Sequence, residues 1–206
     1  MTNKILIILW FALRPKFYLH FFSLIKRKFS FNHDTLINRN KAQAWAIENA
    51  TSYSDALKKL EIMGEKKGLD IDTINEGRKL EKISSVKMGG SAHIDLLYDC
   101  VRLLKAKKVI ETGVAYGWSS LAILKAIYDK GSGKLYSVDM PYPRKKNEKD
   151  VGIVVPKYLR QNWVLIRKPD KPGILDALKQ LDEEIDICHY DSDKSWWGRK
   201  YAYPIL

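Results

Sequence analysis

Strand-like and helix-like stretches alternate from Lys108 to Asp191, and this alternation restricts the possible fold more than any other feature. The strand-like stretches are short and rich in Val, Ile, Leu and Tyr, and the stretches between them have apolar residues at helical spacing. The expected strands are 108–114, 134–140, 162–168 and 185–191, and the expected helices are 118–129, 154–161 and 174–183. Repeated strand–helix–strand units with right-handed crossovers predict an α/β fold, a doubly wound parallel sheet with helices on both faces.

The first 30 residues form a basic and apolar arm. Their six Lys and Arg residues, with no Asp or Glu, carry +6 of the formal net charge of +12. Because these basic residues lie among Ile, Leu, Trp and Phe, the arm suits lipid or a protein groove better than phosphate, and we expect no nucleic-acid partner. Two interpretations remain: the arm lies on a membrane surface, or it packs as a helix on the domain or on a partner.

The longest apolar run of the arm, Ile5 to Leu13, has nine residues, whereas a membrane-spanning helix needs about 20. No small-residue cleavage site follows it, so a secretory signal peptide fits poorly.

Cys100 and Cys188 lie in expected core segments without metal-binding spacing, and we interpret them as buried thiols of a reduced protein. The predicted location is cytoplasmic, with or without peripheral contact with the membrane.

Residues 31–85 are expected to be a helical connector between the arm, 1–30, and the main domain, 86–206. Helical spacing covers 39–50 and 71–82, and Ser54 is the expected N-cap of a helix ending near Gly68. The connector shows no residues that suggest chemistry.

The loop from Glu111 to Ser119 follows the first expected strand and leads into a helix. Ligands of doubly wound sheets bind at the carboxyl ends of the strands, near this first turn. Gly113 permits a tight turn, Gly117 allows a ligand to approach the backbone, and the helix offers free N–H groups and the positive end of its dipole. Asp139 ends the second strand, where an acid can bind both ribose hydroxyls, so the ligand is expected to be a nucleoside derivative.

The glycine spacing argues against a dinucleotide. That fingerprint requires glycines at 113, 115 and 118, but the chain has Ala115 and Trp118. Glu111 beside the helix N-terminus also suits a ligand with a cationic amino group better than a pyrophosphate, because two anions repel each other.

The sequence ETGVAYGWS resembles motif I of class I S-adenosylmethionine (SAM) methyltransferases, with their Rossmann-like fold, in the small-molecule O-methyltransferase branch. The resemblance implies that the acid and glycines line the methionine part of SAM and that Ser119 contacts its carboxylate. Asp139 matches the ribose-binding acid, and KMGGSAHIDLLYDCVRLL is similar to the helix before motif I, whose leading loop often touches SAM. The predicted cofactor-binding residues are Glu111, Gly113, Ala115, Gly117, Trp118, Ser119, Asp139 and Met140.

A second motif, Asp191-Ser192-Asp193-Lys194, is similar to the DADK motif of cation-dependent O-methyltransferases of the caffeoyl-CoA and catechol type. The resemblance implies that Asp191 binds Mg²⁺ or another divalent cation and that Lys194 is the catalytic base, since a cation acidifies a bound hydroxyl and an amine takes its proton. Sugar and macrolide O-methyltransferases, which have His at the lysine position, are the alternative. His189 is interpreted as a hydrogen-bonded core or rim residue.

The family sheet has the order 3-2-1-4-5-7-6, of which this chain is expected to form only 3-2-1-4, without the C-terminal strands. The fourth strand would then be an exposed edge. The expected explanations are a fragment of a longer methyltransferase, a partner or second copy on that edge, or loss of turnover.

The leading hypothesis is a SAM-dependent methyltransferase acting on the hydroxyl of a small molecule. A SAM-binding or interaction module without catalysis is the second hypothesis, and an NAD-dependent enzyme is the third.

Overall fold

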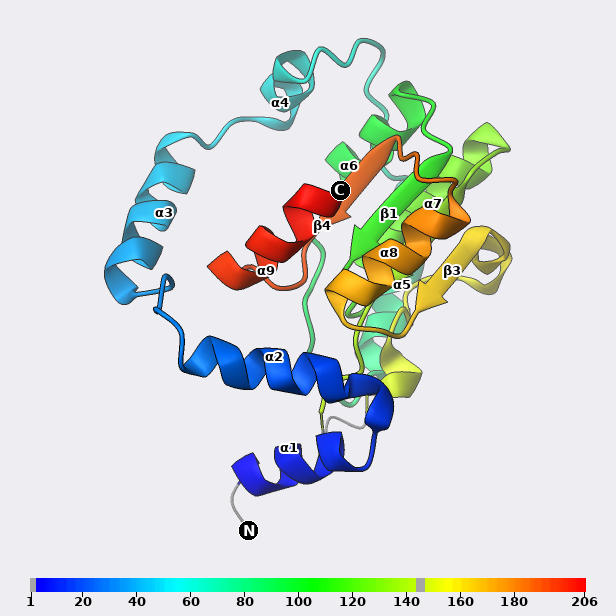
Figure 1. The fold of residues 1–206 in the computed structure, drawn as a ribbon. Helices are drawn as coiled ribbons and strands as arrows, with labels where there is room; N and C mark the ends of the chain where they lie inside the picture. Colours follow the sequence, from blue (N-terminus) through cyan, green and yellow to red (C-terminus); the bar gives the residue numbers. More distant parts are fainter. Residues whose placement is uncertain (1–2, 144–146) are drawn as a thin grey trace.

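The computed structural model describes residues 3–143 and 147–206, and their strands form one parallel sheet of order β3-β2-β1-β4 (Figure 1). The strands are β1 (Lys108–Thr112), β2 (Lys134–Val138), β3 (Trp163–Ile166) and β4 (Ile187–Tyr190). The predicted fold class and strand order are confirmed. Each strand ends one to two residues before its predicted limit, and after β1 the reason is Gly113, whose φ of +80° turns the chain out of the sheet.

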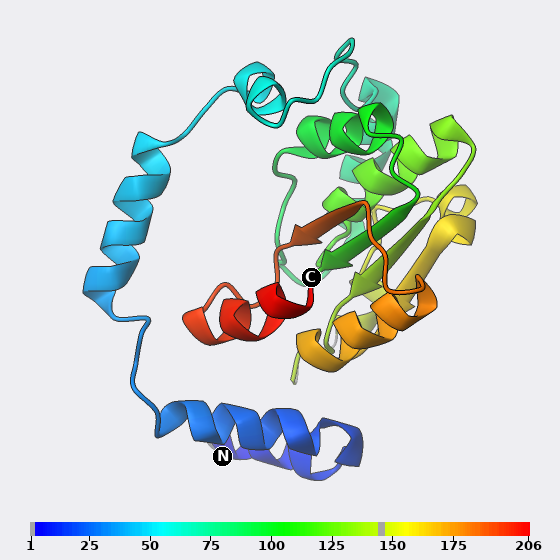
Figure 2. The ribbon, with the colours of Figure 1, turned by 45° about the horizontal axis from the view of Figure 1, so that its top comes forward.

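Helices cover both faces of the sheet (Figure 2). On one face α6 (Ile94–Leu103) and α7 (Trp118–Lys130) pack over Val109 and Leu135. On the other, α8 (Asp170–Gln180) and α9 (Trp196–Ala202) lie with Ile110 and Tyr136 in a second apolar cluster. Alternate residues of the central strand therefore enter different cores, as expected for a parallel sheet buried on both sides.

The strand β4 is one of the two edges of the sheet in the described part of the chain, as predicted, and β3 is the other. The strand β4 pairs with β1, and all four of its residues are only partly buried, whereas four of the five residues of β1 are buried.

Several helices differ from their predicted limits. The helix α4 (Tyr53–Lys59) begins after Ser52, whose side chain accepts from the Asp55 N–H, and it ends well before Gly68, so the predicted cap and length were wrong. The segment predicted as helix 154–161 is instead a 3₁₀ helix, η3 (Lys157–Asn162), because Pro156 disfavours helix in the residue before it. The helix α8 begins four residues earlier than predicted. The other elements are α3 (Leu36–Glu48), α5 (Ile71–Ile83), η2 (Glu148–Asp150) and η4 (Tyr203–Ile205).

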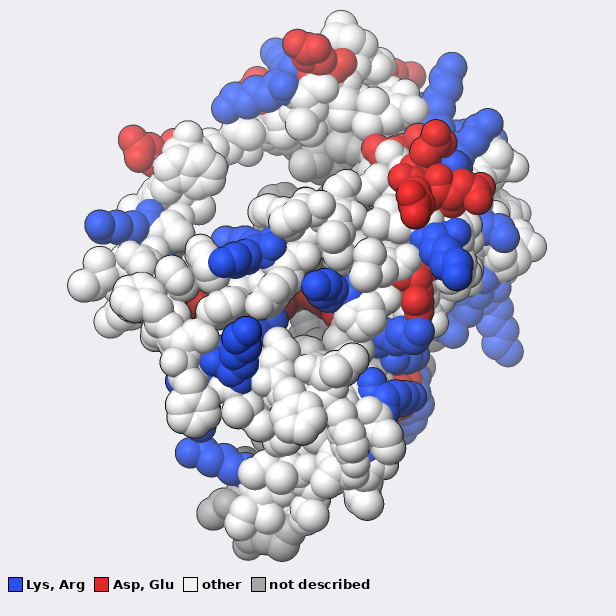
Figure 3. All heavy atoms as spheres, in the orientation of Figure 1, with Lys and Arg blue, Asp and Glu red and all other residues white. Residues whose placement is uncertain are grey.

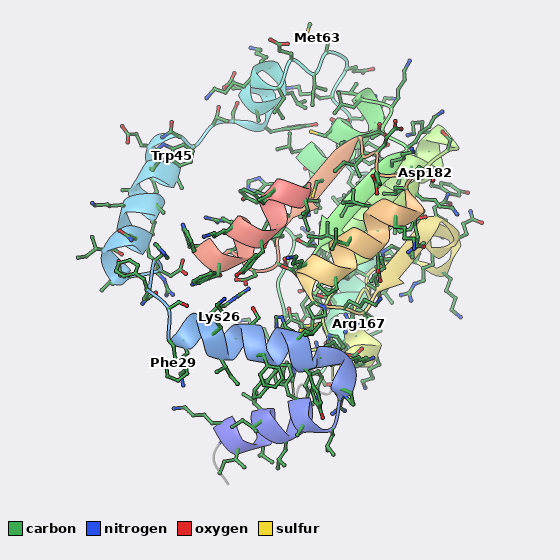
Figure 4. All side chains as sticks on the ribbon, in the orientation of Figure 1. Lys26, Phe29, Trp45, Met63, Arg167 and Asp182 are labelled. Atoms are coloured by element: carbon green, nitrogen blue, oxygen red, sulfur yellow. The ribbon has the colours of Figure 1, made fainter. Side chains whose placement is uncertain are left out.

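The basic arm folds into a helical pair, α1 (Asn3–Ala12) and α2 (Tyr18–Lys28), joined by η1 (Pro15–Phe17). Phe11 and Phe17 are buried in the pair, whereas many of its apolar side chains are exposed. In Figure 4, Phe29 at the end of the pair and Trp45 on α3 are labelled; they are 87% and 66% exposed. Among the described residues no single helix is long and apolar enough to cross a membrane, although the two arm helices, bent by 111°, meet the criteria of length and composition together.

Candidate functional site

A cavity of about 660 Å³ lies at the carboxyl ends of β1, β2 and β4. The loop after each of these strands contributes to its wall, together with the segment before α6. Of the residues predicted for the site, the wall contains Gly113, Ala115, Trp118, Ser119, Asp139, Met140, Asp191 and Lys194. The structure therefore brings both sequence motifs to one cavity, at the position where doubly wound sheets bind ligands.

The glycines of the first loop allow close backbone packing. A Cβ on Gly113 would lie 3.0 Å from the Asp191 carbonyl oxygen, so this glycine lets the loop after β4 approach β1. A Cβ on Gly117 would lie 2.9 Å from the Cα of Gly152, and Gly117 is not part of the cavity wall. The prediction that a ligand approaches the backbone at Gly117 is therefore corrected: a neighbouring loop occupies that side.

Ala115 and the start of α7 shape the wall beside these glycines. Ala115 has a φ of +50°, which is costly for a residue with a Cβ and is most often retained at functional sites. The N-cap of α7 is Gly117, which has no side chain to accept the first N–H groups of the helix. This end of α7 is therefore available to a polar or anionic ligand group.

Trp118 has two roles. Its side chain is 3% exposed and its indole N–H donates to Glu81 of α5, while Gly77 of the same helix lies against its ring. It also contributes to the cavity wall. The position of the Trp118 ring is therefore fixed by its contacts with α5 of the connector. The sequence analysis had given the connector no part in the site.

Glu111 lies behind the cavity wall rather than in it. It is fully buried, and one carboxylate oxygen accepts from the hydroxyls of Ser120 and Ser137. The strand register places Ser137 of β2 and His189 of β4 on either side of it. Its other oxygen, Oε1, is 3.7 Å from His189 Nδ1, and neither atom has a hydrogen-bond partner among the described residues. Glu111 is thus placed to orient His189 rather than to contact a ligand directly.

His189, which the sequence analysis interpreted as a hydrogen-bonded core or rim residue, lies in the wall of the cavity. Its side chain lines the cavity and is 26% exposed, and its Nδ1 lacks the hydrogen bond expected of a core histidine. The one feature of the sequence that could have indicated a role in the site is its position near the end of the fourth strand. Only the register with Glu111 shows that it points to the same face as the acid.

Asp139 combines burial with an ion pair. It is 4% exposed, accepts from the Val114 N–H at 3.2 Å and pairs with Arg167, which also binds Glu148 at 2.7 Å. Burial raises the pKa of the Asp139 carboxyl, and Arg167 opposes that rise. Each carboxylate oxygen has two acceptor positions, so hydroxyl groups of a ligand can still bind beside these partners. Arg167 was not predicted; nothing in its sequence surroundings marks it.

Asp191 and Lys194 form an ion pair of 2.6 Å at the cavity rim, with side chains 51% and 62% exposed. Asp193 points elsewhere and pairs with Arg27 of the arm at 2.6 Å. In residues 3–143 and 147–206, no group of three or more His, Cys, Asp or Glu side chains could hold a metal ion. Asp191 therefore has no second carboxylate beside it in a ligand group of the described residues, and its own carboxylate is paired with Lys194, so this donor set fits a hard divalent cation poorly.

The two cysteines are free thiols, but both are only partly buried, so the prediction that they are buried was wrong. Burial raises the pKa of the Cys188 thiol to about 11, with a further contribution from Glu111. A thiol with a raised pKa is a poor nucleophile, in line with the non-catalytic role expected from the sequence.

Comparison with known proteins gives one family match and several structural similarities. Residues 110–205 match the model of a family described as a methyltransferase domain. No curated protein matches the chain. Among solved structures, it is similar to an SAH-bound methyltransferase of Podospora anserina, with 15% identity and a TM-score of 0.48 over 85% of this chain and 66% of the other.

Two further structures are similar. One, from Staphylococcus aureus, is assigned as a caffeoyl-CoA O-methyltransferase, with 14% identity and a TM-score of 0.44 over 82% and 68% of the two chains. The other is assigned as an O-methyltransferase of Klebsiella pneumoniae, with 19% identity and a TM-score of 0.40 over 72% and 66%. The chain spans about two thirds of the length of these structures. The family match includes the whole segment from Ile110 through both motifs, so residues 110–205 are similar to a methyltransferase domain, as the motifs predicted.

Proposed function

We propose that the chain is a SAM-dependent methyltransferase that acts on a hydroxyl group of a small molecule. The observation that carries this proposal is the cavity at the carboxyl ends of the strands, with Asp139 and the start of α7 in its wall, inside a segment similar to a methyltransferase domain. A SAM-binding module without turnover is the second candidate, because Asp139 and the start of α7 support binding whereas the Asp191–Lys194 pair is exposed.

The cofactor side of the cavity offers separate groups to the ribose and to the carboxylate of SAM. Asp139 can accept hydrogen bonds from the ribose hydroxyls, and Ser119 with the first N–H groups of α7 can bind the carboxylate. When bound, SAM supplies an electrophilic methyl group on a positively charged sulfur. Glu111 Oε1, which has no hydrogen-bond partner among the described residues, adds negative potential behind the wall of the cavity.

Lys194 and Asp191 stand where the acceptor must lose a proton. The acceptor oxygen forms the new C–O bond, the methyl–sulfur bond breaks with its electron pair left on sulfur, and the hydroxyl proton goes to a base. Lys194 can take it only as the neutral amine, which forms when the ion pair with Asp191 opens and Lys194 releases its own proton to the solvent. His189, whose Nδ1 lies 3.7 Å from Glu111 Oε1, is a second side chain in the same cavity that can accept a proton.

The test of cofactor binding is the substitution Asp139→Ala. Loss of a charged acceptor for both ribose hydroxyls should weaken SAM binding by about 1–3 kcal/mol, roughly 5- to 150-fold. The affinity is measured by isothermal titration, with thermal unfolding to check that the variant is folded. Asp186→Ala is the matched control, because Asp186 accepts from backbone N–H groups at the opposite end of the sheet. Equal affinities of the Asp139 variant and the wild type would remove Asp139 from the site.

The exposed apolar surface of the arm leads to a second proposal, that the chain acts in the cytoplasm at a membrane surface. Ile8 and Leu13 are 52% and 76% exposed, in a segment that has basic but no acidic residues. Such a surface gains free energy from apolar burial in the lipid headgroup region and from attraction to anionic lipids.

Liposome sedimentation tests this second proposal. The double variant Ile8→Glu/Leu13→Glu should lose most of its binding to vesicles that contain anionic lipid. The control Leu60→Glu/Met63→Glu makes the same charge change at positions 59% and 83% exposed on the connector, and should still bind. Equal sedimentation of both double variants would contradict a role for the arm.

A further inference from the structure

A second cavity, of about 850 Å³, lies between the arm helix α2 and the helices α8 and α9. Figure 3 shows the surface hollowed in this region, with Lys and Arg side chains around the hollow and acidic atoms within it. Met140 and Asp170 line both this cavity and the predicted cofactor cavity. The two cavities therefore adjoin at Met140 and Asp170.

One wall of the second cavity is apolar. Leu19 and Leu24 of α2 face Leu175 of α8 and Ala202 of α9. Leu19 and Leu175 are 88% and 46% exposed, so apolar side chains continue from the cavity to the outer surface. A hydrocarbon chain bound here would cover these leucines, with a gain of about 25 cal/mol for each Å² of apolar surface removed from water.

The same cavity contains an excess of positive charge. Lys16, Arg27 and Lys171 line it, against the carboxylates Asp170 and Asp193. Neither lysine forms an ion pair with a described residue, and Arg27 pairs with Asp193 at 2.6 Å while its Nε is buried without a partner.

The two acids of the cavity are already engaged. Asp170 accepts from the hydroxyl of Ser192, and Asp193 accepts from Arg27 and from the Ser195 N–H. Burial raises the pKa of Asp193, but the hydrogen bonds from Ser195 and Arg27 outweigh it and hold the pKa below its usual value, so the carboxylate stays ionised. Lys16 lies over the ring of Phe17 and Lys171 over the ring of Tyr201, contacts that leave their N–H donors able to bind an anionic group of a ligand.

We infer that the second cavity binds an amphiphile that carries a phosphate or carboxylate group, with its hydrocarbon part on the leucines and its anion near Lys16 and Lys171. If the proposed methyltransferase function holds, on which this step rests, the acceptor is a hydroxylated amphiphile whose hydroxyl lies near Met140 and Asp170. The arm then has a direct part in acceptor binding, because α2 supplies one wall of the cavity and its Arg27 fixes the loop that contains Lys194.

The experiment is calorimetric titration of the full chain with three probes: dodecyl phosphate below its micelle concentration, dodecyl maltoside and inorganic phosphate. Dodecyl phosphate should bind at least tenfold more tightly than either of the others. Lys171→Gln should weaken its binding at least threefold, and Leu175→Asn should do the same. The control Lys179→Gln removes an exposed lysine of the same helix outside the cavity, and should leave the affinity unchanged.

Each outcome bears on one claim. Equal binding of inorganic phosphate and dodecyl phosphate would show a simple anion site and would overturn the inference. Equal effects of the Lys171 and Lys179 substitutions would also overturn it. So would the absence of dodecyl phosphate binding. SAM titration of the same variants separates the two proposals. Loss of dodecyl phosphate binding with SAM affinity intact removes only the amphiphile site, and dodecyl phosphate binding without SAM binding removes the methyltransferase proposal.

Discussion

Replacing Lys194 with methionine should lower methyl transfer at least roughly 100-fold while SAM affinity stays within about threefold of the wild type, because loss of a general base typically costs 10²–10⁴ in rate. Methionine keeps the length and apolar stem of the side chain but cannot accept the proton. The measurement is transfer of a labelled methyl group from SAM to hydroxylated amphiphiles, with SAM binding determined in parallel.

His189→Gln is the companion variant for this measurement. If Lys194→Met retains full turnover and His189→Gln does not, the base is His189, and the ion pair of Lys194 with Asp191 is a surface contact. Full activity in both variants would exclude both side chains as the base. Lys200→Met is a suitable control, since Lys200 lies on α9 outside the cofactor cavity.

Replacing Glu111 with alanine should lower the free energy of unfolding by about 3 kcal/mol. The substitution removes the acceptor of two buried hydroxyls, Ser120 and Ser137, and leaves a void beneath His189. Glu111→Gln should cost less than about 1 kcal/mol, because the amide oxygen can still accept from the serines and its NH₂ can donate to His189 Nδ1. Urea unfolding measures both values, and equal destabilisation by Ala and Gln would contradict this account of the acid.

The same Glu111 variants separate the two views of its role in SAM binding. Direct contact with the methionine part, as the family resemblance implies, predicts a large loss of affinity in Glu111→Gln. The structure, in which Glu111 lies behind His189 and outside the cavity wall, predicts a change of less than about threefold.

The strand order and the place of the cofactor cavity could be predicted because both follow from local patterns. The apolar period, the glycine turn after β1 and the acid after β2 are each encoded within a few residues, and parallel sheets place their carboxyl ends together. The limits of the elements were less predictable. Ser52 has Asp55 three residues later, a capping-box arrangement that Ser54 lacks, and Ser52 is the cap in the structure.

The second cavity and the alignment of Glu111 with His189 could not be predicted. Arg27 and Asp193 are 166 residues apart in the chain, and no local pattern reports such a pairing. The side-chain direction of His189 depends on the register of β4 against β1, and a shift of one residue would turn it to the other face. The surroundings of the predicted metal ligand Asp191 could not be foreseen for a similar reason, since one motif acid does not show where further ligands would lie.

The most direct test of the central claim is isothermal titration of the full chain with SAM, S-adenosylhomocysteine and NAD, with and without Mg²⁺. The account predicts micromolar binding of the two SAM-type ligands, no binding of NAD and no effect of Mg²⁺, because the donor set around Asp191 fits a cation poorly. Binding of NAD, or of none of the three, would contradict the proposed function.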